Sequence, residues 1–187
     1  MKTQYYTATS IDGYIADDQN SLNWLFQFGQ IKSMQEDYPH FIKQVGAAAM
    51  GSTTYEWVIE QEEMLEHPEK WPYEIPTWVF SSRELPTVDG ANIKFVNGDV
   101  VPVHSDMAKA AGDKNIWLIG GGDLVGQFYE NGILDEIILS VAPVMLGSGA
   151  PLLPRKITSP PLKLIDVQKH EDVFATLTYM VQKETQN

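Results

Sequence analysis

Hydrophobic residues recur along this chain at two spacings, and the two kinds of segment alternate over most of its length. Short apolar or β-branched runs, which predict strands, occur at residues 4–10, 45–50, 77–81, 93–96, 116–119 and 137–141. Apolar residues three and four positions apart predict helices at 31–44, at 103–111 and from Asp123 to Gly132. Strands that alternate with helices pair in parallel, so this part of the chain predicts a parallel sheet.

The end of the chain has a different pattern. Residues 162–167 and 173–181 are rich in strand-forming types and are separated by His170, Glu171 and Asp172, so they predict an antiparallel hairpin. There is no internal repeat and no linker. The 187 residues therefore predict one α/β domain over 1–187, a three-layer fold whose mixed, mainly parallel sheet has flanking helices.

Three consecutive glycines, Gly120, Gly121 and Gly122, lie between a buried-looking strand and a helix start at Asp123 and Leu124. Glycines at a strand end let a ligand approach the backbone, and the following helix directs free N–H groups to the same place. This arrangement binds phosphate. A tight turn explains the glycines equally well. The spacing is not G-x-G-x-x-G, so a Rossmann dinucleotide site is not supported.

Two further strand ends carry residues suited to phosphate. One has a glycine followed by hydroxyls at a helix start, which is also a capping arrangement: Gly51, Ser52, Thr53 and Thr54. The other has two hydroxyls and one of the chain's two arginines: Ser81, Ser82 and Arg83. An arginine with hydroxyls can grip a phosphate, although a surface turn is the simpler explanation.

Composition limits the partners of the chain. A formal net charge of -12 argues against nucleic acid and an anionic membrane surface, since both need clustered Lys and Arg. A small phosphorylated ligand remains compatible, because one pocket can be positive on an acidic protein. There is no cysteine, and we expect no metal site. The lack of a signal core near Met1 and of ~20 apolar residues in a row favours a cytoplasmic protein.

Four motifs taken in order carry a family resemblance: residues 9–16 (TSIDGYIA), 50–56 (MGSTTYE), 119–124 (IGGGDL) and 134–147, which begins LDE and ends PVMLG. Together they resemble the dihydrofolate reductase-like superfamily. More narrowly, they resemble the C-terminal reductase domain of the riboflavin-biosynthesis deaminase–reductase and its small stand-alone relatives.

The resemblance implies a dihydrofolate reductase-like fold, NADPH as hydride donor and a homodimer paired through the C-terminal strands. By position, it places Ala8 and residues 51–54 and 120–124 against the cofactor, and Ser81, Ser82 and Arg83 at the adenosine 2′-phosphate. Asp12 is the expected catalytic residue, orienting the substrate or relaying a proton. Asp12, Tyr14 and Trp24 are the expected substrate contacts, with Trp24 on a loop that covers the site.

Two departures from the resemblance leave the substrate open. Folate reductases usually carry an arginine where this chain has Ser52, and riboflavin-pathway reductases usually carry a glutamate where it has Ile119. The predicted function is an NADPH-dependent reductase of a riboflavin-pathway aminopyrimidine. The alternatives are a folate-type reductase, in which Glu36 or Asp37 would hold the pterin, a reductase of another small heterocycle or carbonyl, and a nucleotide-binding protein without turnover.

Overall fold

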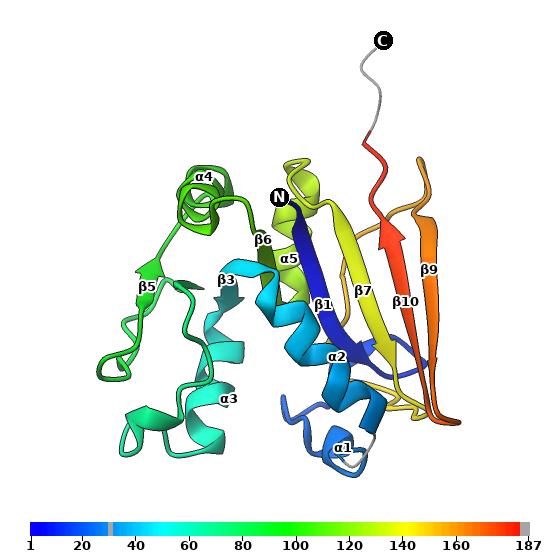
Figure 1. The fold of residues 1–187 in the computed structure, drawn as a ribbon, viewed down its shortest axis with the longest axis horizontal. Coiled ribbons are helices and arrows are strands. Elements are labelled where there is room, and N and C mark those ends of the chain that lie inside the picture. Colours follow the sequence, from blue (N-terminus) through cyan, green and yellow to red (C-terminus); the bar gives the residue numbers. More distant parts are fainter. Residues whose placement is uncertain (30–31, 184–187) are drawn as a thin grey trace.

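The computed structural model describes the backbone of residues 1–29 and 32–183, and the side chains of the same residues apart from 32–36. An eight-stranded sheet with the order β5-β4-β3-β6-β1-β7-β10-β9 forms its centre (Figure 1). The strands are β1 (Thr3–Thr9), β3 (Val45–Gly51), β4 (Thr77–Phe80), β5 (Ile93–Val96), β6 (Asn115–Gly120), β7 (Glu136–Val141), β9 (Lys163–His170) and β10 (Phe174–Met180).

The sheet is parallel from β5 to β7 and antiparallel at the C-terminal hairpin. β1 pairs in parallel with β6 and β7, and β3 pairs in parallel with β4 and β6. β10 is antiparallel to both β7 and β9. Strands in the middle of such a sheet are covered on both faces, which explains why β3 and β6 are almost continuously apolar. The predicted mixed sheet and the terminal hairpin are confirmed.

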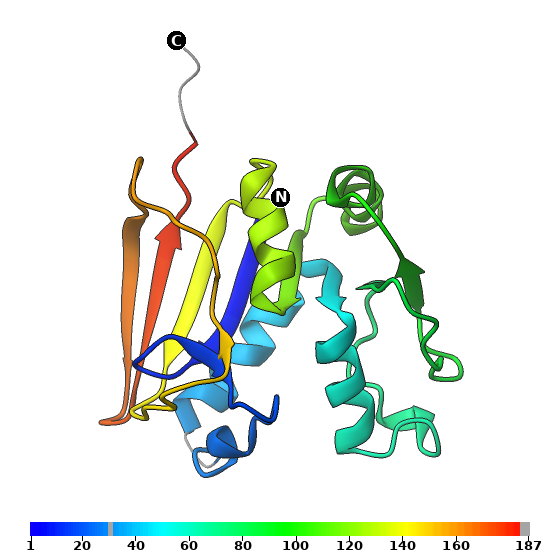
Figure 2. The same cartoon turned by 180° about the vertical axis from the view of Figure 1, so that it is seen from behind.

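Helices cover both faces of the sheet. α2 (Lys32–Lys43) lies on the face seen in Figure 1, while α4 (Val100–Ala111) and α5 (Gly122–Glu130) lie on the face seen in Figure 2. Tyr5, Ile116 and Leu118 belong to the core beneath α4 and α5. Val45 and Trp117, whose side chains point to the other face, belong to the core beneath α2. α3 (Ser52–Gln61) packs with the segment after it around Met50 and Val79, in a third cluster.

Four short elements had no expected counterpart or only an approximate one. β2 (Tyr14–Ala16) pairs antiparallel with β8 (Ala150–Pro151) in a separate two-stranded sheet. Strands of two or three residues are too short to leave a periodic pattern, so the sequence did not predict them. α1 (Asn23–Phe26) lies in the segment around Trp24 for which a covering loop was expected, and η1 (Pro68–Lys70) lies in the polar segment after α3.

Most expected helix and strand bounds agree with the structure, and the differences have local causes. α4 begins at Val100 rather than at residue 103, because Asp99 Oδ1 accepts a hydrogen bond of 2.9 Å from Val101 N and so caps the helix earlier. Pro39 lies inside α2 without ending it. Within the described part of the chain, no helix has the length and apolar character needed to cross a membrane.

Candidate active site

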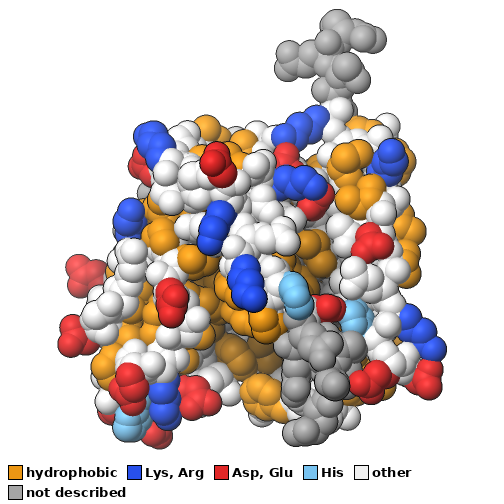
Figure 3. Space-filling model, viewed as in Figure 1, with side chains coloured by type: hydrophobic (Ala, Val, Ile, Leu, Met, Phe, Trp, Pro, Cys, Tyr) orange, Lys and Arg blue, Asp and Glu red, His pale blue; other side chains and the backbone are white. Residues whose placement is uncertain are grey.

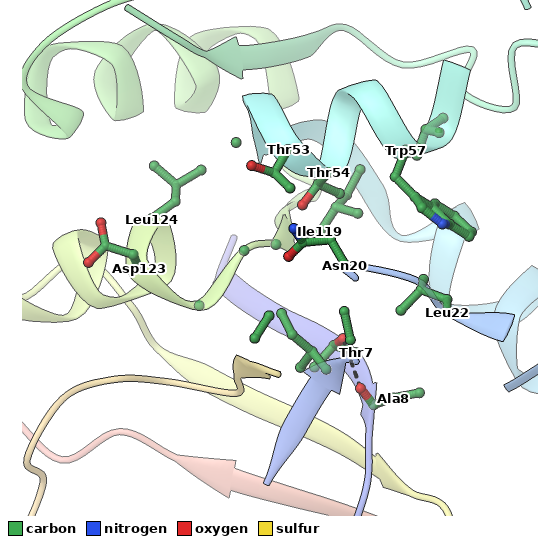
Figure 4. Close-up of a pocket in the computed structure, with 18 of the residues that line it drawn as sticks. Thr7, Ala8, Asn20, Leu22, Thr53, Thr54, Trp57, Ile119, Asp123 and Leu124 are labelled. Carbon is green, nitrogen blue, oxygen red and sulfur yellow. Dashed lines mark hydrogen bonds between the residues drawn. The ribbon is translucent and has the colours of Figure 1, made fainter. Parts of the chain in front are cut away.

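A cavity of about 700 Å³ opens at the carboxyl ends of β1, β3 and β6. Ligands of open α/β sheets bind at this edge. In Figure 3, hydrophobic side chains line a hollow between α2 and α3 on this face. In Figure 4, α3 and α5 approach the cavity from different directions, Thr7 and Ala8 of β1 lie across it from α3, and Leu22 lies near Trp57.

One end of the cavity is formed by two helix N-termini. α3 follows Gly51 directly and α5 follows Gly121 directly; both glycines are extended N-caps, and neither helix has a side-chain cap. A Cβ built on Gly51 would lie 3.7 Å from Gly121 N, so the two loops are neighbours in space. The unsatisfied first-turn N–H groups and the positive ends of two helix dipoles therefore meet at one place, which suits an anion.

Gly120 and Gly122 show why this loop needs glycine. Gly120 has φ 149°, a conformation that side chains rarely adopt, and it lies beside Thr54. A Cβ on Gly122 would lie 2.4 Å from the Pro151 carbonyl oxygen and 2.5 Å from that of Leu152. The segment at Pro151 and Leu152, which follows β7 in the chain, is thus packed tightly against the start of α5.

The other end of the cavity has an aromatic wall, by which we mean Tyr6, Tyr38, Trp57, Tyr73 and Trp117. The Trp117 ring makes edge contacts with Tyr38 at 6.0 Å and with Tyr73 at 5.7 Å between ring centroids. Its Nε1 donates to the Tyr6 carbonyl oxygen at 3.1 Å, which fixes the indole. Aromatic rings arranged in this way favour a planar ligand.

Burial changes the acidity of the phenols in the aromatic wall. It raises the pKa of Tyr6, which the Ser140 side chain opposes and the Asp37 charge reinforces. Burial likewise raises the pKa of Tyr38 and of Tyr73. These phenols therefore keep their protons at neutral pH and can donate hydrogen bonds.

The charged side chain that lines the cavity, Asp123, is already paired. Arg155 Nη1 lies 3.0 Å from Asp123 Oδ1, and the same guanidinium lies 2.7 Å from Glu130. Hydrogen bonds to Glu130 and Asp123 raise the pKa of Arg155. The guanidinium packs over Gly126, where a Cβ would lie only 2.7 Å away. Arg155, beside the N-terminus of α5, is a cation that the sequence did not single out.

The structure brings together most of the expected cofactor residues. Those that line the cavity are Ala8, Gly51, Ser52, Thr53, Thr54, Gly120, Gly121, Gly122, Asp123 and Leu124. Their predicted contacts with a cofactor stay predictions. Six other expected residues, Asp12, Tyr14, Trp24, Ser81, Ser82 and Arg83, lie outside the cavity lining.

Arg83 is held by an acidic partner on α3. Its Nη1 and Nη2 lie 2.9 and 2.7 Å from the two carboxylate oxygens of Glu56. This bidentate pair raises the pKa of the guanidinium. Ser81 Oγ accepts from Arg83 N and donates to the Arg83 carbonyl oxygen, so the segment after β4 is a closed turn. A phosphate at Arg83 would compete with Glu56, and the predicted 2′-phosphate contact stays a prediction.

Asp12 joins two loops. Ser10 Oγ donates to Asp12 Oδ1 at 2.6 Å, and the backbone N–H groups of Leu146 and Gly147 donate to the same carboxylate at 3.1 and 2.7 Å. These hydrogen bonds, that of Ser10 first, lower the pKa of Asp12. The carboxylate therefore ties the turn after β1 to the turn after β7 at the edge of the site. The predicted catalytic role of Asp12 stays a prediction.

Trp24 and Tyr14 belong to the elements around the cavity, but their neighbours line it. Trp24 packs with Ala142 and Phe174, whereas Leu22 and Leu25 from the same segment face the cavity. On β2, Ile15 and Ala16 line the cavity beside Tyr14. Glu36 and Asp37 were the carboxylates considered for holding a pterin. Asp37 lies 3.4 Å from His170, and the side chain of Glu36 lies outside the described residues.

The sequence did not identify the aromatic wall. Its members come from β1, α2, α3, β6 and the segment before β4, and no local spacing joins them. The available signal was the alternation within β1 and β6, which puts Tyr6 and Trp117 on the opposite face from the core residues Tyr5 and Leu118. Ile119, one of the two departures from the family resemblance, also lines the cavity.

Comparison with known proteins identifies the family. The chain matches the model of the RibD C-terminal domain over residues 2–174. It belongs to the RibD C-terminal domain family. Two relatives from Bacillus subtilis (strain 168) carry no assigned activity. The uncharacterized protein YwjB is 31% identical over 151 residues, covering 81% of this chain and 82% of YwjB. The uncharacterized protein YyaP is 28% identical, covering 78% of this chain and 76% of YyaP.

Solved structures agree with this RibD C-terminal domain and with the dihydrofolate reductase-like fold. A protein of Shewanella sp. PV-4, provisionally named for riboflavin biosynthesis, has a TM-score of 0.82 at 25% identity and covers 98% of this chain and 100% of its own. The Thermotoga maritima deaminase/reductase has a TM-score of 0.69 at 14% identity, with 96% and 56% covered. Enterococcus faecalis dihydrofolate reductase complexed with NADP(H) has a TM-score of 0.62 at 13% identity, with 96% and 95% covered.

Proposed function

We propose that this protein is an NADPH-dependent reductase of a small planar heterocycle. The observation that carries the proposal is the division of one cavity into an anion-binding end, made by the N-termini of α3 and α5, and an aromatic wall. A dinucleotide has a pyrophosphate and a planar ring, so it matches both ends. Bound NADPH would supply the hydride.

The residues of the chain fit that cofactor. Gly51 and Gly121 leave the first-turn N–H groups of two helices open to a pyrophosphate, and Thr53 and Thr54 add hydroxyls at the same edge. The phenols of the aromatic wall and Leu22 would orient a flat ring and limit the access of water. Membership of the RibD C-terminal domain family and the fold shared with a deaminase/reductase support a reductase as the reaction class, and they leave the substrate open.

Two kinds of substrate are compatible with the aromatic wall. A riboflavin-pathway aminopyrimidine that carries a phosphoribosyl group, 5-amino-6-(5-phosphoribosylamino)uracil, is the first candidate, because the family includes its reductase. An uncharged heterocycle without phosphate is the second, favoured by the rings of Trp57 and Trp117 and by Ile119. Comparing that aminopyrimidine with its dephosphorylated form separates the two candidates, since only the phosphate differs.

A titration with NADPH and, separately, NADH tests the cofactor. Nicotinamide fluorescence reports binding, and the melting temperature provides an independent readout. Gly51→Ala is the informative variant: its φ is -80° and its Cβ meets only ordinary contacts, but the methyl points between the two helix N-termini. We expect Gly51→Ala to keep its melting temperature and to weaken NADPH binding about tenfold or more. If the wild-type protein and Gly51→Ala bind NADPH with equal affinity, the cofactor does not bind between the N-termini of α3 and α5.

Turnover is tested separately by NADPH oxidation with a panel of heterocycles and carbonyl compounds. Tight NADPH binding without oxidation by any acceptor would instead support the nucleotide-binding alternative. If neither nucleotide binds, the glycine loops are structural turns and the reductase proposal is wrong.

A further inference from the structure

A line of hydrogen-bonding side chains runs beneath α2 from solvent to the cavity. Asp37 Oδ2 on α2 lies 3.4 Å from His170 Nδ1 at the end of β9. The other ring nitrogen of His170, Nε2, lies 2.8 Å from Thr176 Oγ1 on β10. Thr176 Oγ1 lies 3.0 Å from Ser140 Oγ on β7. Ser140 and Tyr6 of β1 both line the cavity, and the Ser140 side chain lowers the pKa of the Tyr6 phenol.

The register of the sheet produces this line. Ser140 lies opposite Ala8 on one side and opposite Thr176 on the other. Residues directly opposite one another share a face of a sheet, as do residues two apart on one strand. Tyr6, two residues before Ala8, is therefore on the same face as Ser140 and Thr176. The line therefore crosses the adjacent strands β9, β10, β7 and β1.

The two ends of the line have different surroundings. Ser140 is 1% exposed, His170 3% and Thr176 8%, whereas the Asp37 side chain is 41% exposed. At the inner end, Tyr6 and Ser140 both line the cavity at or near the aromatic wall. A cluster that only satisfied buried polar groups would have no need to connect solvent with the cavity. This one joins an exposed carboxylate to a phenol at the site.

The reaction of the proposed function needs a proton at this place. Hydride addition to a C=N or C=O group gives carbon two electrons and leaves a negative charge on the heteroatom, which must be protonated. Among the described cavity residues, the carboxylate of Asp123 is paired with Arg155 at the opposite end. Burial raises the pKa of Tyr6, so its phenol holds a proton that it can give to the substrate.

We propose that Tyr6 donates the proton that accompanies hydride transfer, and that Ser140, Thr176 and His170 return a proton to it from solvent. The hydride forms a C–H bond on the substrate, and the Tyr6 O–H proton moves to the adjacent nitrogen or oxygen. Ser140 then protonates the phenolate, Thr176 protonates Ser140, and the Nε2–H of His170 protonates Thr176. Nδ1 of His170 takes a proton from solvent beside Asp37 as the Nε2–H proton leaves, so the imidazole stays neutral, and a change of tautomer then restores the starting state. This inference rests on the proposed reductase function.

Thr176→Val tests the relay, because valine keeps the shape of threonine and removes the hydroxyl in the middle of the line. Thr178→Val is the matched control, since Thr178 is two residues further along β10, on the same face but outside the line. Thr176→Ser should restore the path. With an acceptor that the wild-type protein reduces, we expect kcat to fall about tenfold or more in Thr176→Val only, as for loss of general-acid assistance. The KM and the Kd for NADPH should stay unchanged.

The solvent deuterium isotope effect on kcat separates a relay from a structural role. It should rise in Thr176→Val, where proton delivery becomes slow, and stay at the wild-type value in Thr178→Val and Thr176→Ser. If Thr176→Val turns over with the wild-type kcat and isotope effect, the relay is wrong. An equal loss in Thr176→Val and Thr178→Val would also overturn it, because the effect would then be one of packing.

A spectroscopic measurement tests the relay without turnover. In protein labelled with ¹⁵N-histidine at neutral pH, His170 Nε2 should carry a proton that is bonded to Thr176, and its signal should shift in Thr176→Val but not in Thr178→Val. An unprotonated Nε2 in the wild-type protein would reverse the direction of the line and overturn the inference. If the wild-type protein reduces no acceptor, the proposed function fails, while this spectrum still shows whether His170 can act as the donor.

Discussion

Replacing Gly122 with alanine tests whether the start of α5 and the segment around residues 151 and 152 are packed as closely as the structure shows. The new Cβ would lie 2.4 Å from the Pro151 carbonyl oxygen, where an ordinary contact begins at 3.4 Å, so one segment must move by about 1 Å. The movement also strains two hydrogen bonds of Leu152: Tyr5 Oη donates to its carbonyl oxygen at 3.1 Å, and its N donates to the Gly13 carbonyl oxygen at 2.9 Å.

The cost can be estimated from these contacts. Overpacking of this kind costs about 1–3 kcal/mol, and a weakened hydrogen bond adds roughly 0.5–1.5 kcal/mol. A total of about 2–4 kcal/mol lowers the Tm of a domain of this size by roughly 4–16 °C. Thermal and urea unfolding of Gly122→Ala measure it, with Gly51→Ala as the control, since the nearest atom to its Cβ is 3.7 Å away. If Gly122→Ala and Gly51→Ala have the same Tm, the close packing of Gly122 against Pro151 is wrong.

Three further predictions concern charge and assembly. Glu56→Gln should release Arg83 from its ion pair and so strengthen the binding of NADPH relative to that of NADH. Arg83→Ala should weaken the binding of NADPH and leave that of NADH unchanged. If the ratio of the two affinities is unchanged in both variants, the 2′-phosphate binds elsewhere. Asp12→Asn should lower the Tm at neutral pH. The difference in Tm from the wild type should disappear as the pH falls below 3.8, because a carboxylate whose pKa is lowered by folding loses its stabilising effect when it is protonated. A Tm difference that does not change with pH would contradict this. β9 is an exposed edge strand, and Val167 on it is 56% exposed, so it could pair with the same strand of a second copy. Val167→Asp should then dissociate the dimer, as measured by light scattering, whereas Val167→Thr should not. A monomeric wild-type protein would refute pairing through β9.

The sheet could be predicted because its determinants are local. A run such as that of β3, Val45–Gly51, is apolar throughout, and a terminal pair such as β9 and β10 is separated by an evident turn. The glycine loops were found for the same reason: the conformation of Gly120 requires glycine, and α5 starts two residues later, at Gly122. Backbone requirements of this kind remain visible in a single sequence.

The side chains of the site are determined by contacts between distant segments, and there the sequence was a weaker guide. The carboxylate of Asp12 receives the N–H of Gly147, 135 residues away, so the sequence around Asp12 could not show that its acceptors are occupied. Trp24 lies in the expected covering segment, but the side of α1 that faces the cavity is that of Leu22 and Leu25. Periodicity gives the face of a regular element, and this segment is too short to have one.

The residues proposed for cofactor binding and those proposed for proton delivery lie in different parts of the structure, so two substitutions can test them independently. Gly51 lies at the end where α3 and α5 begin, while Thr176 lies two strands beyond β1, under α2, and does not line the cavity. Gly51→Ala should therefore weaken NADPH binding without raising the solvent isotope effect, and Thr176→Val should do the reverse. Sites with no shared partners contribute additively, so the double variant should show both losses at their single-variant sizes. Strong non-additivity would mean that the two ends of the cavity act as one unit, because only a shared structural change could couple side chains so placed.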